Sequence, residues 1–134
     1  MAVADRHGRP VALVVTSPLP HEVTLVRLTL AARFVAARPQ RLVGDRAYDA
    51  DPLDRELAAL GTELIAPHRA NRSRPRTQDG RPLRRLARRW KVERLNAWLQ
   101  GCRRLVTRYE YYLENFAGFA HLGCLRILLR RFLR

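Results

Sequence analysis

The sequence predicts an α/β fold, in which helices pack on a sheet of short strands. Short apolar runs rich in β-branched residues alternate along the chain with segments whose apolar residues recur at helical spacing. This alternation is typical of an α/β sheet. The 134 residues are the size of one ordinary domain and suffice for a hydrophobic core. No internal repeat and no linker divides the sequence, so we expect a single domain over residues 1–134.

The first predicted elements are a hairpin and a helix. The run VALVVT (11–16) follows the turn-like stretch RHGRP and, with the opening AVA, predicts two strands joined by a turn. SPLPH then interrupts the pattern. From Glu22, apolar residues at helical spacing predict a helix that continues up to Pro39.

Two further strands flank a second predicted helix. RLVGD (41–45) predicts a minimal buried strand that ends on an acid, and TELIAP (62–67) predicts another short strand. Between them, DADPLDRELAALG predicts a helix with Asp51 as its N-cap, proline at the first helical position and Gly61 as its stop. The predicted order is therefore strand, strand, helix, strand, helix, strand.

The second half of the chain combines a basic loop with long helices. Residues 68–82 have neither apolar periodicity nor enough hydrophobes to pack, which predicts a loop that is mobile without its partner. A long helix is expected from Leu83 to about Val106, with Trp90 and Trp98 in the core, and a final helix covers the C-terminus. The polar face of the long helix carries Arg85, Arg89, Glu93, Asn96, Gln100 and Arg104.

The chain is strongly basic, and its excess charge is concentrated in one segment. Against 26 lysines and arginines there are 12 acids, which gives a net charge of +14. Residues 67–108 contain 14 of the basic residues and two of the acids, so this segment accounts for +12 of the total. Such a surface predicts a polyanionic partner, with nucleic acid ahead of an anionic membrane. The C-terminal apolar stretch is too short and too charged to span a bilayer, and a packed core helix explains it more simply than an interfacial one.

Cysteine spacing gives no sign of a zinc site or of a disulfide framework. Cys102 and Cys124 are the only cysteines, and neither lies in a CxxC motif or in a paired Cys/His spacing. This usage fits the reducing cytoplasm. The N-terminal MAVADRHGRP also lacks the apolar core of a signal peptide. We therefore expect a cytoplasmic protein without a membrane partner.

Two acids are candidates for metal chemistry, and each has a simpler alternative. Asp45 directly follows a predicted strand, where acids of α/β sheets often bind ligands, but an aspartate there also commonly caps a turn. Glu93 lies four residues after Arg89, and a helical pair of this kind contributes only about 0.2–0.5 kcal/mol. Together with a basic surface, the two carboxylates suit metal-dependent phosphodiester chemistry, in which the metal activates a water or hydroxyl for in-line attack.

Three stretches of the sequence resemble DDE transposases of bacterial insertion sequences. They are LVGDRAYDADPLDREL (42–57), RRWKVERLNAWLQGCRRLVTRYEYYLENFAGFAHLGCLRILLRRFL (88–133) and ADRHGRPVALVVTSPLPHE (4–22), the last of which resembles the family's strand pair. The similarity is to the C-terminal part of the catalytic domain, in the group named after insertion sequence five. That group is related to the one named after insertion sequence four.

The resemblance implies a partial ribonuclease H-like fold that lacks its first strand and ends in a long C-terminal helix pair. It also implies three metal-binding acids, with Asp45 as the second and Glu93 as the third, and Mg²⁺ or Mn²⁺ as the cofactor. The family's first acid lies on the central first strand, upstream of the hairpin motif, and Asp5 in that motif is not its equivalent. We therefore expect a truncated catalytic domain that does not catalyse strand transfer alone.

The family's helix signature is only partly present, so the role of its lysine in binding transposon-end DNA is not assigned here. Arg89 matches the arginine of the signature, whereas Leu86 stands at the tyrosine position and Gln100 at the lysine position. Contacts to DNA phosphates are expected from Arg74, Arg76, Arg85, Arg89, Lys91 and Arg104.

Other functions stay open at this point. The chain could be a non-catalytic DNA-binding remnant or the partner of an upstream transposase fragment, and a homo-oligomer is compatible with both. A peptide that binds membrane surfaces is a third alternative. Three tyrosines, Tyr109, Tyr111 and Tyr112, could stack on bases, but the resemblance implies that they pack the last two helices.

Overall fold

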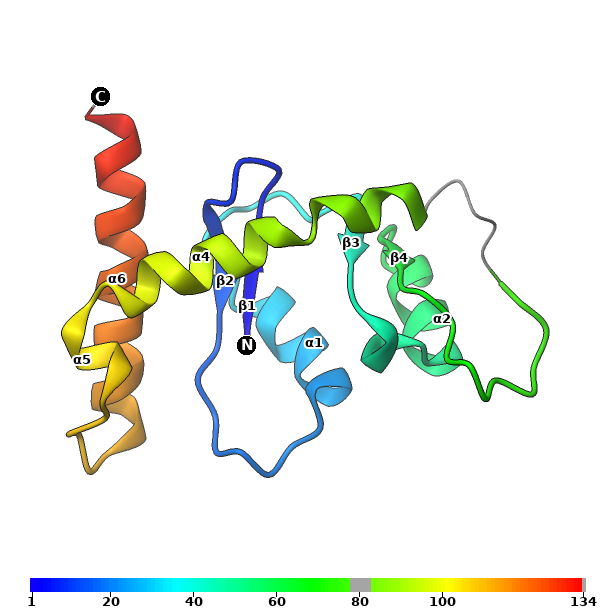
Figure 1. Ribbon diagram of the computed structural model, residues 1–134, viewed down its shortest axis with the longest axis horizontal. Coiled ribbons are helices and arrows are strands. Elements are labelled where there is room, and N and C mark those ends of the chain that lie inside the picture. Colours follow the sequence, from blue (N-terminus) through cyan, green and yellow to red (C-terminus); the bar gives the residue numbers. More distant parts are fainter. Residues whose placement is uncertain (78–82, 134) are drawn as a thin grey trace. The chain divides into compact units, whose positions relative to one another are not determined.

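The computed structural model describes residues 1–77 and 83–133, which form two compact units. One unit comprises Met1–Val35 and Trp90–Arg134, and we call it the hairpin unit; the other, Ala36–Arg89, is the parallel-strand unit. Figure 1 labels the helices and strands of both. Strands and helices alternate along the chain, which confirms the prediction of a mixed α/β protein.

The hairpin unit begins with the predicted strand pair. Strands β1 (Ala2–Ala4) and β2 (Pro10–Leu13) are antiparallel. In the turn between them, an oxygen of the Asp5 carboxylate accepts hydrogen bonds from the backbone N–H groups of residues 7 and 9, at 2.7 and 2.9 Å. Gly8 has a φ of +76°, a conformation that favours glycine at this point of the turn.

Helix α1 (Glu22–Ala31) is shorter than the sequence predicts. The helix was expected to continue up to Pro39, but the chain after Ala31 turns back along β2 instead. The backbone N–H of Phe34 donates to the Val11 carbonyl at 2.7 Å, and Arg33 forms a bridge with the same strand. Because these backbone groups are satisfied by the strand, they cannot also extend the helix.

The long helix predicted over 83–106 is wrong as a single element. It is divided into a 3₁₀ helix, η2 (Arg84–Arg88), followed by α4 (Trp90–Gln100) and α5 (Arg103–Val106). Gly101 separates the last two, in keeping with the low helix propensity of glycine. At the other end, arginines repeat four residues apart (84 and 88, 85 and 89), and such like-charge pairs disfavour an α-helix.

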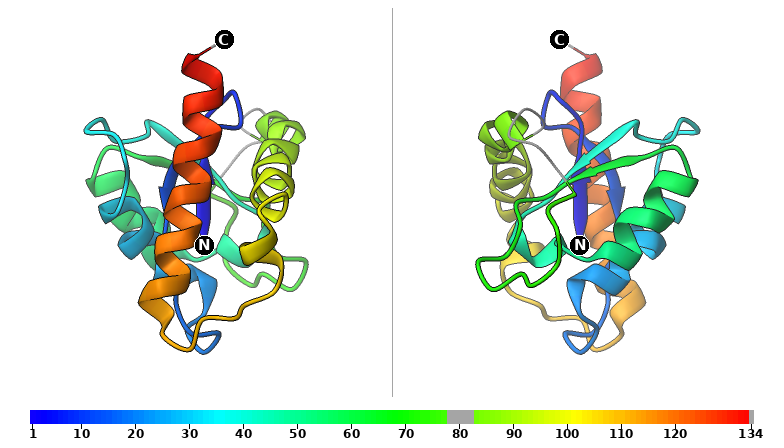
Figure 2. Two further views of the ribbon diagram at one scale, coloured as in Figure 1. Left: turned by 90° about the vertical axis from the view of Figure 1, so that its left-hand side faces the viewer. Right: turned by 90° about the vertical axis from the view of Figure 1, so that its right-hand side faces the viewer.

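The final helix, α6 (Leu113–Phe132), confirms the prediction of a C-terminal helix. Figure 2 shows it beside the hairpin, and it packs on β2 and on α4. Gly123 allows the close approach to α4, since a Cβ there would lie 3.1 Å from a methyl carbon of Leu99. No described helix combines the length and the apolar character needed to span a bilayer.

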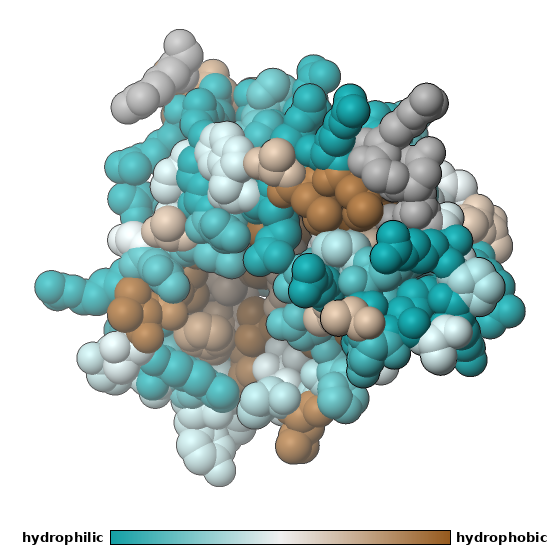
Figure 3. Space-filling view, turned by 45° about the vertical axis from the view of Figure 1, so that its right-hand side comes forward, coloured by the Kyte–Doolittle hydropathy of each residue, from teal (hydrophilic) through white to brown (hydrophobic). Residues whose placement is uncertain are grey.

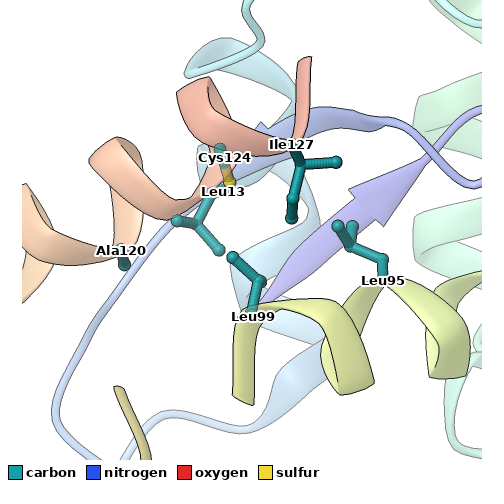
Figure 4. Close-up of a cluster of buried hydrophobic side chains, with 6 residues drawn as sticks. All are labelled: Leu13, Leu95, Leu99, Ala120, Cys124 and Ile127. Atoms are coloured by element: carbon teal, nitrogen blue, oxygen red, sulfur yellow. The ribbon is translucent and has the colours of Figure 1, made fainter. Parts of the chain in front are cut away.

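Figure 4 shows the core of the hairpin unit, where side chains from β2, α4 and α6 point toward one another. Leu95 is completely buried there. Burial, with a smaller contribution from Cys102, raises the pKa of the Cys124 thiol to about 11, so it stays protonated and packs as an apolar group. The buried cluster consists of Leu13, Leu95, Leu99, Ala120, Cys124 and Ile127.

One of the two tryptophans predicted to lie in the core is exposed. Trp90 is 49% exposed. Trp98 is half-buried and packs against the core. Trp90 is five residues before Leu95, which is about 140° around the helix, and it is the Leu95 side of α4 that packs on the core.

The parallel-strand unit has the predicted strand–helix–strand order. Strands β3 (Arg41–Val43) and β4 (Glu63–Ile65) are parallel, and α2 (Asp51–Ala59) connects them and packs on β4. Apolar side chains of α2 and β4 are buried in this unit, and they are Leu53, Leu57, Leu64 and Ile65.

Of the two predictions for the ends of α2, one is confirmed and the other is wrong. Gly61 follows the helix with a φ of +76°, which confirms it as the stop. The N-cap is Ala50 rather than Asp51, so that prediction is wrong. Asp51 lies in the first helical turn, and its carboxylate binds arginines of the basic loop instead of capping the helix.

Truncation of the buried leucine of α4 should destabilise the hairpin unit. We expect Leu95→Ala to lower the free energy of unfolding by about 2–5 kcal/mol, because it leaves a cavity at a fully buried position. Urea unfolding followed by circular dichroism measures the change. The matched control is Leu19→Ala at a leucine that is 87% exposed, which should change it by no more than about 0.5 kcal/mol. Equal effects would contradict the packing.

Candidate functional site

Asp45 lies at the carboxyl end of the parallel strand β3. Gly44, which precedes it, still donates its N–H to the Ile65 carbonyl of the neighbouring strand. The Asp45 side chain then caps the 3₁₀ helix η1 (Arg46–Tyr48), and its Oδ1 accepts the backbone N–H of Ala47 at 2.9 Å. Asp45 therefore caps a turn, as the simpler alternative predicted, at the position where parallel sheets present ligand-binding side chains.

The second oxygen of Asp45 faces an arginine. Its Oδ2 lies 3.7 Å from Nη1 of Arg89, and the two side chains are 41% and 43% exposed. An exposed pair at this distance contributes only about 0–1 kcal/mol, so the carboxylate is accessible and weakly held. The pair also places a guanidinium beside the acid, within the same unit.

Glu93 lies in the first turn of α4 and is exposed. A carboxylate at this end of a helix is stabilised by the helix dipole. Glu93 belongs to the hairpin unit and Asp45 to the parallel-strand unit, so each acid is described in its own surroundings. Their joint binding of one metal stays a prediction. Within residues 1–77 and 83–133, no three His, Cys, Asp or Glu side chains come together as a metal site.

Sequence reasoning missed a buried ionic network centred on Asp49. The Asp49 side chain is only 7% exposed, and its Oδ1 lies 2.9 Å from Nδ1 of His68 and 2.7 Å from Nη1 of Arg72. Its Oδ2 accepts the backbone N–H of Arg69 at 2.7 Å. Burial by itself would raise the pKa of Asp49, but these donors and the Arg72 charge outweigh it and hold the pKa below its ordinary value.

Asp51 extends this network to two arginines of the basic loop. Its Oδ1 lies 2.7 Å from Nη2 of Arg72 and its Oδ2 3.1 Å from Nη1 of Arg74. Hydrogen bonds from these two arginines lower the pKa of Asp51. In its described part, 68–77, the basic loop is thus anchored to the acids that precede and begin α2. The predicted loop also includes residues 78–82, which lie outside the described residues.

The six residues predicted to contact DNA divide between the two units. Four belong to the parallel-strand unit, and they are Arg74, Arg76, Arg85 and Arg89. Of the two in the hairpin unit, Arg104 binds Glu110 at 3.0 Å, and Lys91 donates to the Arg6 carbonyl. Figure 3 shows one face of the molecule, on which hydrophilic side chains predominate. Contacts of these residues with DNA stay predictions.

Arg94 forms a second feature that the sequence reasoning missed. Its guanidinium lies 4.7 Å from the centre of the Trp90 ring and 4.8 Å from that of Trp98, so it stacks between them. Arg131 of α6 adds a further cation, 5.3 Å from the Trp98 ring. The spacing Trp90, Arg94, Trp98 is i, i+4, i+8 on one helix, and this pattern could have indicated the stack in advance.

The three tyrosines between α5 and α6 do not pack the last two helices. Tyr109, Tyr111 and Tyr112 are 72%, 89% and 63% exposed. The Arg108 guanidinium binds the backbone carbonyls of residues 110 and 111 and so orders this connection. The expected packing role is therefore wrong, and the alternative, stacking on bases, is compatible with their exposure.

Comparisons with known proteins identify the family. Residues 1–128 match the model of the family described as "Transposase DDE domain". The chain belongs to this family. It is also 33% identical, over 130 residues, to a Burkholderia cepacia protein named "Putative transposase for insertion sequence element IS402". This result confirms the resemblance to DDE transposases of insertion sequences.

The alignment with the Burkholderia cepacia protein covers the two chains to different degrees. The alignment covers 91% of this chain but 58% of the Burkholderia cepacia protein, so the chain spans somewhat more than half of that relative's length. No solved structure matches the chain. Asp45 and Glu93 both lie within the residues that match the family, so both stay candidates for a functional role.

Removal of the central acid of the loop network should release the basic loop. We expect Asp49→Asn to lower the free energy of unfolding at pH 7 by about 1–3 kcal/mol, because charged hydrogen bonds are lost. The control is Glu63→Gln, which breaks an exposed pair with Arg41 and should cost about 0–1 kcal/mol.

The pH dependence gives an independent measurement. The Asp49 and Asp51 pKa values are lowered in the folded protein, so their stabilisation is complete above the ordinary aspartate pKa. It is lost as the pH falls through the lowered values. Unfolding measured between about pH 6 and 2 should show this loss, with a smaller loss in Asp49→Asn. Identical pH profiles for both proteins would contradict the network.

Proposed function

We propose that this chain supplies two of the three acids of a DDE transposase active site. In the complete protein, Asp45 and Glu93 would act with Mg²⁺ or Mn²⁺ to cleave DNA and transfer a strand of an insertion element. The observation that carries this proposal is the family match over residues 1–128, with Asp45 at the carboxyl end of strand β3. We assign the chain to the insertion-sequence-five group because of its WKVER and RYE motifs.

The chemistry of the two acids fits the proposed metal. Mg²⁺ binds carboxylate oxygens and is commonly held by one or two carboxylates, with waters and substrate phosphates completing the shell. Asp45 and Glu93 are exposed enough to offer an oxygen each. When bound, the metal would activate the attacking water or hydroxyl and stabilise the leaving oxygen. Arg89, beside Asp45, would hold the DNA phosphate by its guanidinium fork.

The sheet pairing supports a ribonuclease H-like fold completed by a further strand. Among the described residues, β1 pairs only with β2, and β3 only with β4. Each of these four strands thus has a single strand neighbour, and β2 has in addition an isolated bridge to Arg33. We propose that an upstream transposase segment supplies a strand and the first acid, and that residues 1–134 are part of one catalytic domain. This chain alone should not catalyse strand transfer.

Non-catalytic DNA binding is the second candidate. The concentration of positive charge in residues 67–108 favours it whether or not Asp45 and Glu93 bind metal. A remnant of this kind would coat DNA or complement an upstream fragment, as a monomer or as a homo-oligomer. Both candidates act on DNA, so we also propose a cytoplasmic location and no membrane partner.

Substitution of the two proposed metal ligands should abolish transposition by the complete protein. The chain is co-expressed with the upstream segment of a transposase, and excision of a marked element is counted. We expect Asp45→Asn and Glu93→Gln each to reduce excision at least about 100-fold, since even outer-shell partners of a metal site cost up to that factor.

The control for this assay is Asp54→Asn. Asp54 belongs to α2, and burial with the nearby Asp51 raises its pKa, so its neutral isostere should fold normally and retain excision. Excision that survives Asp45→Asn would contradict the catalytic proposal. DNA binding without excision in every combination would support the non-catalytic alternative.

DNA affinity should depend steeply on salt. We expect the logarithm of the binding constant for a fluorescent duplex to fall linearly with that of the salt concentration, between about 50 and 200 mM. Arg76→Ala and Arg85→Ala should each reduce this slope by about 1 if the side chain binds a phosphate. Arg55→Ala, an exposed cation of α2 outside the basic segment, is the control. A salt-independent affinity would contradict phosphate binding.

A further inference from the structure

Helix α6 is apolar on two opposite sides. One side lies in the core of the hairpin unit and contains Cys124 and Ile127. Leu122, Leu125 and Leu129 are each two residues from one of these, which is about 200° around a helix. A helix that is apolar on both sides is usually covered on both sides.

The outward-facing side is well exposed in the described structure. We call it the outer stripe of α6, and it consists of Leu122, Leu125, Leu129 and Phe132. These side chains are 59%, 50%, 47% and 75% exposed. Single exposed apolar residues are ordinary, but a continuous row of four on one helix marks an interaction surface.

The spacing of the outer stripe indicates what kind of element covers it. The residues follow one another at intervals of three, four and three, which is the a/d repeat of paired helices. The three leucines of the stripe line a surface hollow together with Leu133, Arg126 and Arg130. A second helix with apolar residues at the same spacing would place its side chains into this row.

The charges beside the outer stripe select among possible partners. The last turns of α6 carry Arg126, Arg130 and Arg131, and residues 120–134 contain no acid. Arg126 and Arg130 border the hollow directly. A second copy of α6 would bring arginines against arginines, which is unfavourable in paired helices, whereas glutamates or aspartates beside the apolar seam would pair with them.

We propose that the outer stripe of α6 binds an amphipathic helix whose apolar a/d seam is flanked by acidic residues. This surface lies in the hairpin unit and does not use Asp45 or Glu93, so the interaction is separate from the proposed catalysis. It would recruit a partner protein through a helix of that chemistry.

Two synthetic peptides test the proposal. Both have three heptads with leucine at a and d, and they carry either glutamate or lysine at e and g. Binding to the 134-residue chain is measured by fluorescence anisotropy. We expect the glutamate peptide to bind, and the lysine peptide to bind about tenfold more weakly or worse. Leu125→Glu and Leu129→Glu should each raise the Kd for the glutamate peptide by about tenfold or more, since a charge replaces a leucine that the bound peptide would cover.

Charge reversal and a matched leucine control complete the experiment. The double variant Arg126→Glu, Arg130→Glu should reverse the preference, so that the lysine peptide binds better. Leu19→Glu, at an exposed leucine outside the helix, should leave binding unchanged. Circular dichroism confirms that each variant is folded.

Several outcomes would overturn the proposal. Equal affinity for both peptides, or a preference that charge reversal does not change, would remove the acidic helix as the occupant. Self-association that Leu125→Glu abolishes would point to a second copy instead. Binding to vesicles of anionic phospholipid, lost in the same variant while neither peptide binds, would assign the stripe to a membrane surface.

Discussion

Burial of Leu95 and Leu99 between the hairpin and α6 is the interaction on which the hairpin unit depends. These two leucines fix the rotation of α4 about its own axis, because only one side of the helix enters the core. Glu93 and Trp90 are consequently exposed, whereas Trp98 packs against the core. The same packing that stabilises the unit therefore leaves the Glu93 carboxylate exposed to solvent.

The parallel-strand unit depends on a different interaction, in which acids hold a basic loop in a protein that carries a large positive charge. Two acids at the start of α2, Asp49 and Asp51, bind the loop arginines and neutralise part of their repulsion. Asp45, only a few residues earlier, accepts the backbone N–H of Ala47 and has a longer, exposed contact to Arg89. Within one short segment, Asp49 and Asp51 are thus held by arginines of the loop, whereas the Asp45 carboxylate is accessible.

Neighbouring acids in that segment could not be assigned from their order alone. The sequence motif around Asp45 indicated a functional acid, and its place after β3 agrees with a ligand-binding position. Asp51 was expected to cap the helix, and nothing in the spacing indicated a different role for Asp49. In the structure the Asp49 side chain is buried with His68 and Arg72. Both residues are aspartates next to the same helix. Only their burial and their partners from distant parts of the chain distinguish their roles.

The sequence by itself determined the family, the α/β alternation, the hairpin turn, the Gly61 stop and the C-terminal helix. These features depend on local patterns, such as residue periodicity, glycine geometry and contiguous motifs, which are visible without a partner. Only the tertiary structure decided where α1 ends, where the long helix breaks and which aromatic residues are exposed. Those outcomes depend on contacts between distant segments, as when the backbone N–H of Phe34 bonds to β2 or Leu95 of α4 packs against α6, and local propensity does not encode such contacts.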